Sequence, residues 1–412
     1  MDSHMTTSMP TRRACLCLGL SAAGSIALPF RAGAQSAAQP FEQWIESFRP
    51  RARARGISDA TYNRVMGGLK PDMGVFALQR SQPEFSEQLW QYLNRRVSEW
   101  RITFGKERAR EFAPLLARIE KDYGVAPVTL LGLWGMETAF GDPVVQQNHF
   151  RPVFPSLAAL AWGEPRRRAY WEKELLNALA IVERGWSNPA EMRGSWAGAM
   201  GHTQWMPEVW LNIGFDYDGD GRASPFGKPD DALAGSARYL IQRGRYRRGE
   251  PWGCEVRAPA GAGGGERRYA EWQKLGVTRA DGKTFTHQEA AARLWMPVPG
   301  GPAFLIGQNF EAVKSYNPSV NYALAVCHLG DRVLGGAPFV QAFPGSERPP
   351  SLAEVQEIQK RLTALGFDTA GSDGRIGLET MKAVRDFQRK AGMAPADGYA
   401  GVKLLARLRQ GL

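Results

Sequence analysis

Apolar residues recur at helical spacing along much of the chain, which predicts a mainly α protein. In the segment PVTLLGLWGMETAFG, we expect a helix to begin at Pro127 and to stop near Gly141, because proline suits a first helical turn and glycine ends helices. Similar spacing covers residues 41–69 and 83–123, where glycine and proline mark the turns. The first third of the chain is therefore predicted to be helical.

One acidic residue lies on the apolar stripe of the helix at 127–141. Leu130, Leu133 and Trp134 share a face with Glu137 at helical spacing. A carboxyl group surrounded by Leu and Trp, at the negative end of a helix dipole, is expected to retain its proton. A retained proton is what a general acid needs. The alternative is that Glu137 edges the stripe and contacts solvent or an arginine.

The C-terminal 60 residues have a separate helical pattern. The pentad DGRIG at 373–377 returns as DGYAG at 397–401, each time just before a helix, and Asp-Gly supplies a turn with a positive-φ residue. The preceding segment, residues 334–351, has the composition of a linker, so few contacts are expected across this boundary. Two apolar stripes support the helices: Val355, Ile358, Leu362 and Leu365 on one, and Met381, Val384, Phe387 and Gln388 on the next.

Length and composition indicate a globular protein of more than one domain. The 412 residues suggest about two or three domains. Hydrophobic residues make up 43% and charged residues 23%, and no apolar run after the N-terminus approaches the roughly 20 residues of a membrane span. We therefore expect a soluble protein with no transmembrane segment. The run PAGAGGG at 259–265 is expected to be a surface loop.

The N-terminus has the pattern of an export signal. Arg12 and Arg13 precede an apolar stretch and the small-residue site Ala32-Gly33-Ala34, so residues 1–34 are predicted to be removed. The arginine pair suggests the twin-arginine route, with ordinary Sec export as the alternative, and the sequence predicts export without deciding the route. Residues 1–34 hold three basic and one acidic residue, so the net charge of +11 becomes +9 after cleavage. An exported basic protein points to an anionic cell wall or membrane headgroups as its partner rather than nucleic acid.

Metal hydrolase and catalytic-triad chemistry are disfavoured. The five histidines are scattered without metal-ligand spacing, and no G-x-S-x-G, H-E-x-x-H or phosphate-loop motif is present. Cys254 and Cys327 remain after signal cleavage and could pair in an oxidising compartment. Two buried free thiols are the preferred interpretation.

A glycine-rich and tryptophan-rich cluster, GSWAGAMGHTQWMP at 194–207, suggests a substrate groove. Glycine lets the backbone approach a ligand closely, and aromatic rings can stack on sugar faces. Ser195, His202 and Gln204 offer polar contacts there. Any single Trp in the cluster is expected to belong to the core.

The segment FDYDGDGRASPFGKPDD resembles a calcium loop. Asp216, Asp218 and Asp220 alternate, Gly221 follows at the sixth position, and Arg222 would contribute its backbone carbonyl. An EF-hand requires Glu at position twelve, where this chain has Gly227, so Asp230 would have to close an enlarged loop. The alternative is an Asp-Gly turn in solvent.

A further cluster, SYNPSVNYALAV, places Tyr316 and Asn317 just before Pro318 and a predicted helix. Whether Tyr316 meets Ser195 and Glu137 depends on the fold, which the sequence does not show.

Two parts of the chain resemble known families. The segment SDGRIGLETMKAVRDFQRKAGMAPADGYAG is similar to the small three-helix peptidoglycan-binding domain. Upstream, over about residues 41–340, the chain resembles the membrane-bound lytic transglycosylase B family in the order and spacing of five motifs. These motifs are WGMETAFG, GSWAGAMGHTQWMP, the DxDxDG loop, PWGCEV and SYNPSVNYALAV. The resemblance implies a mainly α, lysozyme-like α+β core. It also implies cleavage of the bond between N-acetylmuramic acid and N-acetylglucosamine without water, leaving a 1,6-anhydro sugar.

The same resemblance implies roles for individual residues. Glu137 matches the catalytic acid, which then acts as base. Ser195 and Tyr316 would position the N-acetyl group and the saccharide, with Gln204 and Asn317 as further candidates. No cofactor is needed for this chemistry, and Ca²⁺ would be structural.

The expected organisation is an export signal at 1–34, a catalytic domain at 41–340, a linker at 341–350 and a peptidoglycan-binding domain at 351–412. We expect a periplasmic monomer whose partner is peptidoglycan and not nucleic acid. One rival is a lysozyme-type hydrolase with Asp142 as its second carboxylate. The other is a non-catalytic wall-binding protein.

Overall fold

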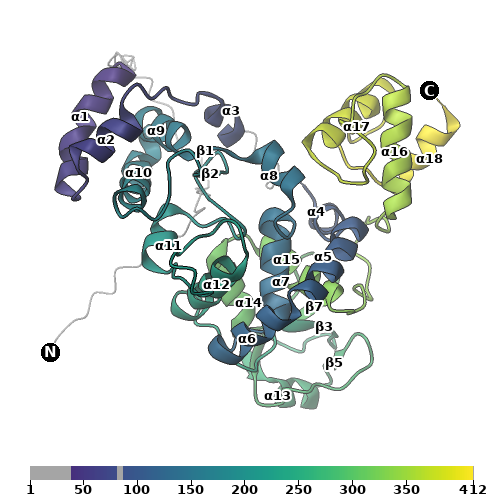
Figure 1. The fold of residues 1–412 in the computed structure, drawn as a ribbon. Coiled ribbons are helices and arrows are strands. Elements are labelled where there is room, and N and C mark those ends of the chain that lie inside the picture. Colours follow the sequence, from purple (N-terminus) through teal and green to yellow (C-terminus); the bar gives the residue numbers. More distant parts are fainter. Residues whose placement is uncertain (1–38, 81–86, 412) are drawn as a thin grey trace, which may run out of the picture. The chain divides into compact units, whose positions relative to one another are not determined.

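The computed structural model describes residues 39–80 and 87–411, so the predicted export signal at 1–34 lies outside the described residues. The chain divides into two compact units, Met1–Ser81 with Gln146–Asp231, and Gln82–Val145 with Ala232–Leu412. The described part is mainly helical, as the sequence predicted (Figure 1). No described helix combines the length and the apolarity needed to cross a membrane.

The first unit is built around α9 and α10. Helix α9 is buried along nearly its whole length, and α10 packs against it. Ser58 caps α2 by accepting a hydrogen bond from the backbone N–H of Thr61. The elements are α1 (Phe41–Ala54), α2 (Asp59–Met66), α3 (Gly74–Arg80), β1 (Arg151–Pro152), α9 (Val153–Gly163), the 3-10 turn η2 (Pro165–Arg167), α10 (Arg168–Glu183), β2 (Arg193–Gly194) and α11 (Pro207–Asn212). Helices α8 (Pro143–His149) and α12 (Asp230–Gln242) contain residues of both units.

The centre of the second unit is a pair of closely packed helices, α7 (Pro127–Thr138) and α15 (Val320–Val333), which lie side by side (Figure 1). A Cβ atom added to Gly132 would lie 2.1 Å from the carbonyl oxygen of Val326, and one added to Gly330 would lie 2.0 Å from that of Val128. Only glycine permits such an approach. Around the pair lie α4 (Leu89–Arg96), α5 (Glu99–Glu111), α6 (Ala113–Tyr123) and α14 (Gln308–Tyr316).

The second unit also contains an antiparallel five-stranded sheet in which the sequence analysis located no strand. The strand order is β4-β6-β7-β3-β5. The predicted surface loop at 259–265 lies between β3 and β4 and is largely exposed, which confirms that prediction. The elements are β3 (Gly253–Arg257), β4 (Glu266–Arg268), α13 (Tyr269–Lys274), β5 (Thr278–Arg279), β6 (Ala291–Trp295) and β7 (Ala303–Gly307).

The C-terminal domain has three helices, α16 (Leu352–Ala364), α17 (Leu378–Lys390) and α18 (Val402–Gln410). The predicted repeat is a structural one. In the first turn, the backbone N–H of Gly374 donates to the Gln359 side chain at 2.8 Å, and in the second, Gly398 donates to Gln388 at 2.8 Å. In each turn the aspartate accepts a 2.9 Å hydrogen bond from the backbone N–H of the third pentad residue. Two buried glutamines therefore hold two equivalent turns.

The expectation of few contacts across the linker is wrong, because Arg375 of the C-terminal domain forms an ion pair with Asp142 at 2.8 Å and the side chain of Gln91 on α4 donates to Asp397 at 2.7 Å. The linker itself is also held in place. The backbone N–H groups of Val340 and Gln341 donate to the Glu255 carboxylate at 2.7 and 2.8 Å. Phe339 stacks on His328, with ring centroids 3.8 Å apart. Apolar and acceptor groups of the sheet and of α15 thus hold a segment whose proline and glycine content indicated a free linker.

Candidate active site

The structure confirms the predicted helix around Glu137. Helix α7 has Pro127 in its first turn and is followed by Ala139 in the left-handed region, at φ 50°. Leu130, Leu133 and Trp134 are buried, whereas Glu137 is half-buried. The acid thus lies where the apolar stripe reaches the surface, with part of its side chain accessible.

Tyr322, which the sequence analysis did not single out, contacts the acid directly. Its hydroxyl donates to Oε1 of Glu137 at 2.5 Å. Ser319 caps α15 by accepting a hydrogen bond from the backbone N–H of Tyr322, so the phenol is carried by the first turn of that helix. Burial, followed by the nearby charge of Glu137, raises the pKa of Tyr322 well above its usual range. The phenol therefore stays protonated and remains a donor.

This hydrogen bond modifies the expected state of Glu137. A donor aimed at a carboxylate favours the charged form, whereas apolar surroundings favour the neutral form. The structure thus places opposing influences on one carboxyl group. The sequence indicated only influences that favour the neutral form.

Tyr316 and Asn317 lie in the same unit as Glu137. Tyr316 ends α14, is buried, and has its hydroxyl 3.3 Å from the Ser236 hydroxyl. It is close enough to Tyr322 to contribute to the raised pKa of that residue. The side-chain oxygen of Asn317 accepts a 3.1 Å hydrogen bond from the backbone N–H of Ser319. Asn317 thus shapes the entry to the helix that carries Tyr322.

Ser195 and Gln204 belong to the first unit. Ser195 is half-buried, and its hydroxyl accepts a hydrogen bond from the backbone N–H of Ala199 at 3.2 Å. Gln204 is buried with φ 54°, and its side-chain amide donates to the carbonyl of Gly201 at 3.1 Å. Both side chains therefore support their own loop.

The glycines of this loop approach the protein's own atoms, where the sequence suggested approach to a ligand. A Cβ atom on Gly201 would lie 2.1 Å from the Pro225 carbonyl oxygen, and one on Gly194 would lie 2.1 Å from that of Ala199. Trp205 is fully buried, as expected for a core residue. Tight packing of the loop accounts for these glycines.

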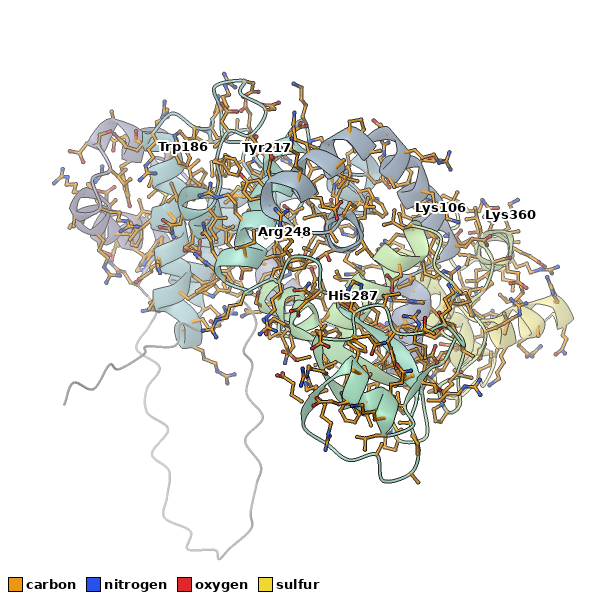
Figure 2. All side chains as sticks on the ribbon, turned by 90° about the horizontal axis from the view of Figure 1, so that it is seen from below. Lys106, Trp186, Tyr217, Arg248, His287 and Lys360 are labelled. Carbon is orange, nitrogen blue, oxygen red and sulfur yellow. The ribbon has the colours of Figure 1, made fainter. Side chains whose placement is uncertain are left out.

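The acidic loop brings together a set of carboxylates that differs from the predicted one. Oxygens of Asp216, Asp218 and Asp231 lie within 4.8 Å of one another, and among the described acids Asp220 and Asp230 are outside this group. Asp231, in the first turn of α12, accepts hydrogen bonds from the backbone N–H groups of Tyr217 at 2.7 Å and Ser224 at 2.8 Å (Tyr217 is labelled in Figure 2). Burial raises the pKa of Asp231.

Oxygen donors that converge in this way are the ligands that Ca²⁺ prefers. Asp220 accepts a hydrogen bond from the backbone N–H of Arg222 at 2.9 Å, and a carbonyl ligand from Arg222 stays a prediction, as does Asp230.

Asp142, the second carboxylate of the rival hydrolase, is committed to structural contacts. It is 3% exposed, and its Oδ1 accepts a hydrogen bond from the backbone N–H of Val144 at 3.0 Å. Its Oδ2 lies 2.8 Å from Nη2 of Arg375 in an ion pair. These contacts leave it poorly placed to activate a water molecule.

Cys254 and Cys327 are buried free thiols, as predicted. Burial raises the pKa of the Cys254 thiol to about 12, so it has little thiolate character.

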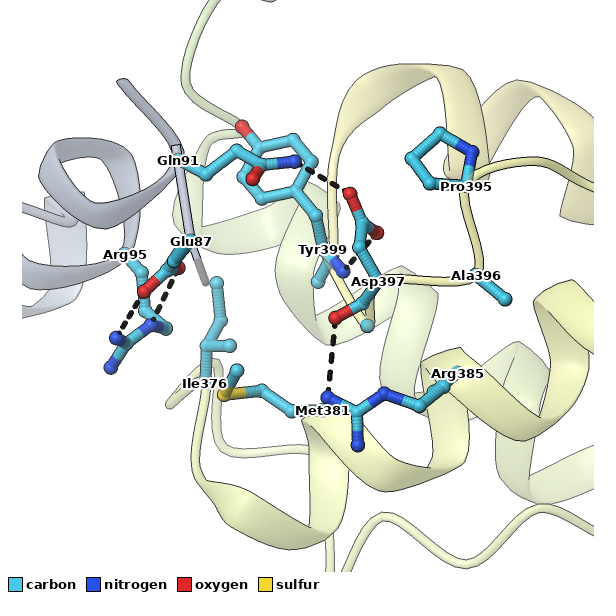
Figure 3. A pocket seen from close by; sticks show the side chains of 12 residues that line it. Glu87, Gln91, Arg95, Ile376, Met381, Arg385, Pro395, Ala396, Asp397 and Tyr399 are labelled. Carbon is cyan, nitrogen blue, oxygen red and sulfur yellow. Dashed lines mark hydrogen bonds and ion pairs between the residues drawn. The ribbon is translucent and has the colours of Figure 1, made fainter. Parts of the chain in front are cut away.

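A cavity of about 420 Å³ lies where α4 meets the C-terminal domain (Figure 3). None of the predicted site residues is among its described lining. Its polar groups bond mainly to one another: Glu87 pairs with Arg95 at 2.6 Å, and Gln91 donates to Asp397 at 2.7 Å (Figure 3). This cavity is part of a domain contact.

Two family descriptions match the chain. Residues 40–331 match the "Transglycosylase SLT domain", and residues 351–408 match the "Putative peptidoglycan binding domain". Because the first match covers most of the chain, the protein belongs to the transglycosylase SLT domain family.

Individual relatives agree with this assignment. Membrane-bound lytic murein transglycosylase B of Escherichia coli K12 is 29% identical over 226 residues, which is 54% of this chain and 61% of that protein. The structure of SltB3 from Pseudomonas aeruginosa in complex with NAG-anhNAM-pentapeptide is 39% identical with a TM-score of 0.69, covering 90% of this chain and 100% of that one. The Escherichia coli lytic transglycosylase Slt35 in complex with calcium is 25% identical with a TM-score of 0.59, covering 72% and 94%.

Proposed function

We propose that this protein is a lytic transglycosylase that cleaves the β-1,4 bond between N-acetylmuramic acid and N-acetylglucosamine in peptidoglycan, with Glu137 as acid and then base. The observation that carries the proposal is the half-buried Glu137 carboxyl group at the end of α7, held by the hydroxyl of Tyr322 at 2.5 Å. The family match and the ligand in the SltB3 complex support it.

One carboxyl group suffices if the sugar supplies its own nucleophile. Glu137 gives its proton to the glycosidic oxygen as the bond to the anomeric carbon breaks. The 6-hydroxyl of the muramic acid then attacks that carbon, and its proton passes to the Glu137 carboxylate. The acid is regenerated, no water is consumed, and the product carries a 1,6-anhydro ring. Glycosidases that use water normally need two carboxylates.

Tyr322 fits this cycle as a positioning residue. It holds one carboxyl oxygen of Glu137, which fixes the orientation of the group that exchanges the proton. A donor at this point also stabilises the carboxylate formed when the proton has left. The balance between this donor and the apolar neighbours suits a group that must first give a proton and then take one.

Ser195, Gln204, Tyr316 and Asn317 are proposed to position the saccharide, as the family resemblance implies. Tyr316 and Asn317 have the stronger structural support, because both lie beside the turn that leads to Tyr322. Ser195 and Gln204 lie on the glycine-rich loop of the first unit.

The acidic loop is proposed to bind a structural Ca²⁺ through Asp216, Asp218 and Asp231, with Asp220, Arg222 and Asp230 as the remaining predicted ligands. The calcium complex of Slt35 supports this proposal. Ca²⁺ that binds only the folded state raises the melting temperature. Chelation with EDTA should therefore lower it, and added Ca²⁺ should restore it, with activity at low temperature retained. No shift in either direction would leave only an Asp-Gly turn.

We also propose export to the periplasm through residues 1–34, and attachment to peptidoglycan through the domain at 351–412 with 341–350 as the connection. Residues 41–340 would form a catalytic domain that works as a monomer. The positive charge of the chain fits an anionic wall.

Borohydride labelling of sacculi during digestion tests the reaction type, because borohydride reduces free reducing ends but not anhydro ends. We expect glycan to dissolve without a rise in labelled ends. One labelled end per cleavage would favour the hydrolase, and binding without release of fragments would favour the non-catalytic protein.

A further inference from the structure

The C-terminal domain is docked on the helices that surround the acid, through the two turns of its repeat. The third residue of each pentad contributes to this contact. Tyr399 of the second turn accepts a hydrogen bond from the side-chain amide of Asn94 on α4 at 2.8 Å, and its ring packs edge-on against Trp90 at 4.9 Å. Arg375 of the first turn lies over the Trp100 ring of α5 at 4.5 Å. The two equivalent turns thus face two neighbouring helices.

Arg375 reaches further than Tyr399, to the segment that follows the acid. Its Nη2 lies 2.8 Å from Oδ2 of Asp142, whose side chain is 4% exposed. Asp142 is five residues after Glu137 in the chain. A carboxylate this deeply buried depends on a partner, because an unpaired charge in such a position is strongly unfavourable.

The segment between Glu137 and Asp142 needs external support. Ala139, Phe140 and Gly141 have φ values of 50°, 62° and 75°, and the left-handed region is unfavourable for alanine and phenylalanine. Such residues persist only where surrounding contacts impose the conformation. At one end the buried Phe140 ring packs against Trp134, with centroids 5.9 Å apart. At the other end the support is Asp142.

Asp142 stabilises the loop through two hydrogen bonds that involve the backbone. Its Oδ1 accepts the hydrogen bond from the backbone N–H of Val144 at 3.0 Å, and its own backbone N–H donates to the carbonyl of Thr138 at 3.1 Å. Thr138 is the residue next to Glu137, so a change in Asp142 reaches the last turn of α7 through one hydrogen bond.

We infer that Arg375 is a positioning residue for the reaction, supplied by the C-terminal domain: by neutralising Asp142 it holds the loop 139–142 and, through that loop, the end of α7 that carries Glu137. The domain is then part of the catalytic apparatus as well as an attachment to the wall. This inference rests on the proposed role of Glu137.

The test compares the third residues of the two pentads in the full-length protein, on soluble glycan fragments for which wall attachment is irrelevant. We expect Arg375→Ala to lower kcat about tenfold with KM within about twofold of wild type. Tyr399→Phe, which removes the hydrogen bond from Asn94 to the other turn, should leave both constants unchanged. Arg375→Lys keeps the charge and should recover most of the lost kcat. Arg375→Ala combined with Asp142→Asn should lose less than Arg375→Ala alone, because no buried charge is left unpaired.

Hydrogen exchange separates positioning from general destabilisation. In Arg375→Ala the amides of Gly141, Asp142 and Val144 should exchange faster, while those of α16 and α17 keep their protection. Unchanged exchange at these amides, or a kcat within twofold of wild type, would overturn the inference. If the wild-type protein releases reducing ends, the proposed reaction fails, yet the effect of Arg375 on the cleavage rate can still be measured.

Discussion

The α7–α15 pair and the C-terminal three-helix domain bury different kinds of polar side chain. The helix pair contains ionisable groups: Glu137 with its donor Tyr322, and on α15 His328 and Asp331, whose pKa values are lowered to about 3 and raised to about 6 by burial. The C-terminal domain buries two neutral amides, Gln359 and Gln388, each bonded within its own turn.

This difference distinguishes the region suited to proton transfer from the region that has a structural role. Ionisable groups in apolar surroundings have altered proton affinities, which is what proton transfer requires, and they make stability depend on pH. Neutral amides that are hydrogen-bonded within their own turn provide rigidity, but they neither transfer protons nor make stability depend on pH. Proton chemistry is therefore expected in the helix pair, and the C-terminal domain is expected to act through its contacts.

The strongest test of the comparison is Glu137→Gln. The amide can neither give nor accept the catalytic proton, so activity should fall by roughly 10²–10⁴-fold while the protein folds normally. Turnover of soluble glycan fragments measures the effect. Glu107→Gln, an exposed glutamate on α5, is the matched control and should behave as wild type. Activity within tenfold of wild type in Glu137→Gln would remove Glu137 from the mechanism.

Asp331→Asn should change the pH dependence of stability. Burial raises the pKa of Asp331 from 3.8 to about 6, so the folded state binds a proton more tightly and the free energy of unfolding falls as pH rises through this window. The variant cannot ionise and keeps an acceptor for the Trp252 side chain. The free energy of unfolding of the variant should rise relative to that of wild type between about pH 4 and 6. The rise should be at most on the order of 3 kcal/mol, since the residue is partly exposed.

The pKa shift of His328 has the opposite effect on the pH dependence of stability. Its pKa is lowered to about 3 by burial, so the folded state loses stability as pH falls below 6.5. Because wild type and Asp331→Asn both contain His328, its contribution cancels in the difference between their free energies of unfolding. A difference that does not change with pH would contradict the assignment of Asp331.

Gln388→Ala should destabilise the C-terminal domain without a pH dependence. The change leaves the Gly398 N–H without its acceptor and removes one of the two donors to Oδ1 of Asp397, which costs about 1–3 kcal/mol. Gln359→Ala should cost a similar amount, because it breaks the same contact in the first turn. Calorimetry at pH 5 and pH 8 should give equal losses. A loss confined to one pH would mean that ionisable groups control this domain too.

Tyr322→Phe should give the smallest effect, a fall in kcat of about tenfold, or about 1.4 kcal/mol. Without the donor, the carboxylate of Glu137 is less stabilised, so the alkaline limb of the pH–rate profile should move to higher pH. Tyr246→Phe is the control, because that hydroxyl contacts Ala126 and Thr129 at the other end of α7. An unchanged pH profile in Tyr322→Phe would reduce the contact to packing.

The sequence predicted what is local and missed what depends on tertiary contacts. The helix with Glu137 and the repeated turns follow from patterns within a few residues. The contact between Tyr322 and Glu137 joins positions 185 residues apart and depends on glycines that let α7 and α15 approach. No sequence pattern identifies that pairing.

Two other differences between the sequence predictions and the structure also arise from tertiary contacts. Asp231 joins the acidic group where Asp230 was expected, because the orientation of the first turn of α12 decides which of two adjacent acids faces the loop. Arg375 was only a turn residue in the sequence, and its role depends on the docking of a domain that seemed to be connected by a free linker.

The central claim is that one carboxyl group acts without water, and digestion in water enriched in oxygen-18 tests it most directly. Soluble glycan is cleaved, and the new ends are analysed by mass spectrometry. The account predicts ends that are lighter than a reducing sugar by one water and that carry no oxygen-18. Reducing ends that contain oxygen-18 from the first turnover would contradict it and would require a second group that activates water.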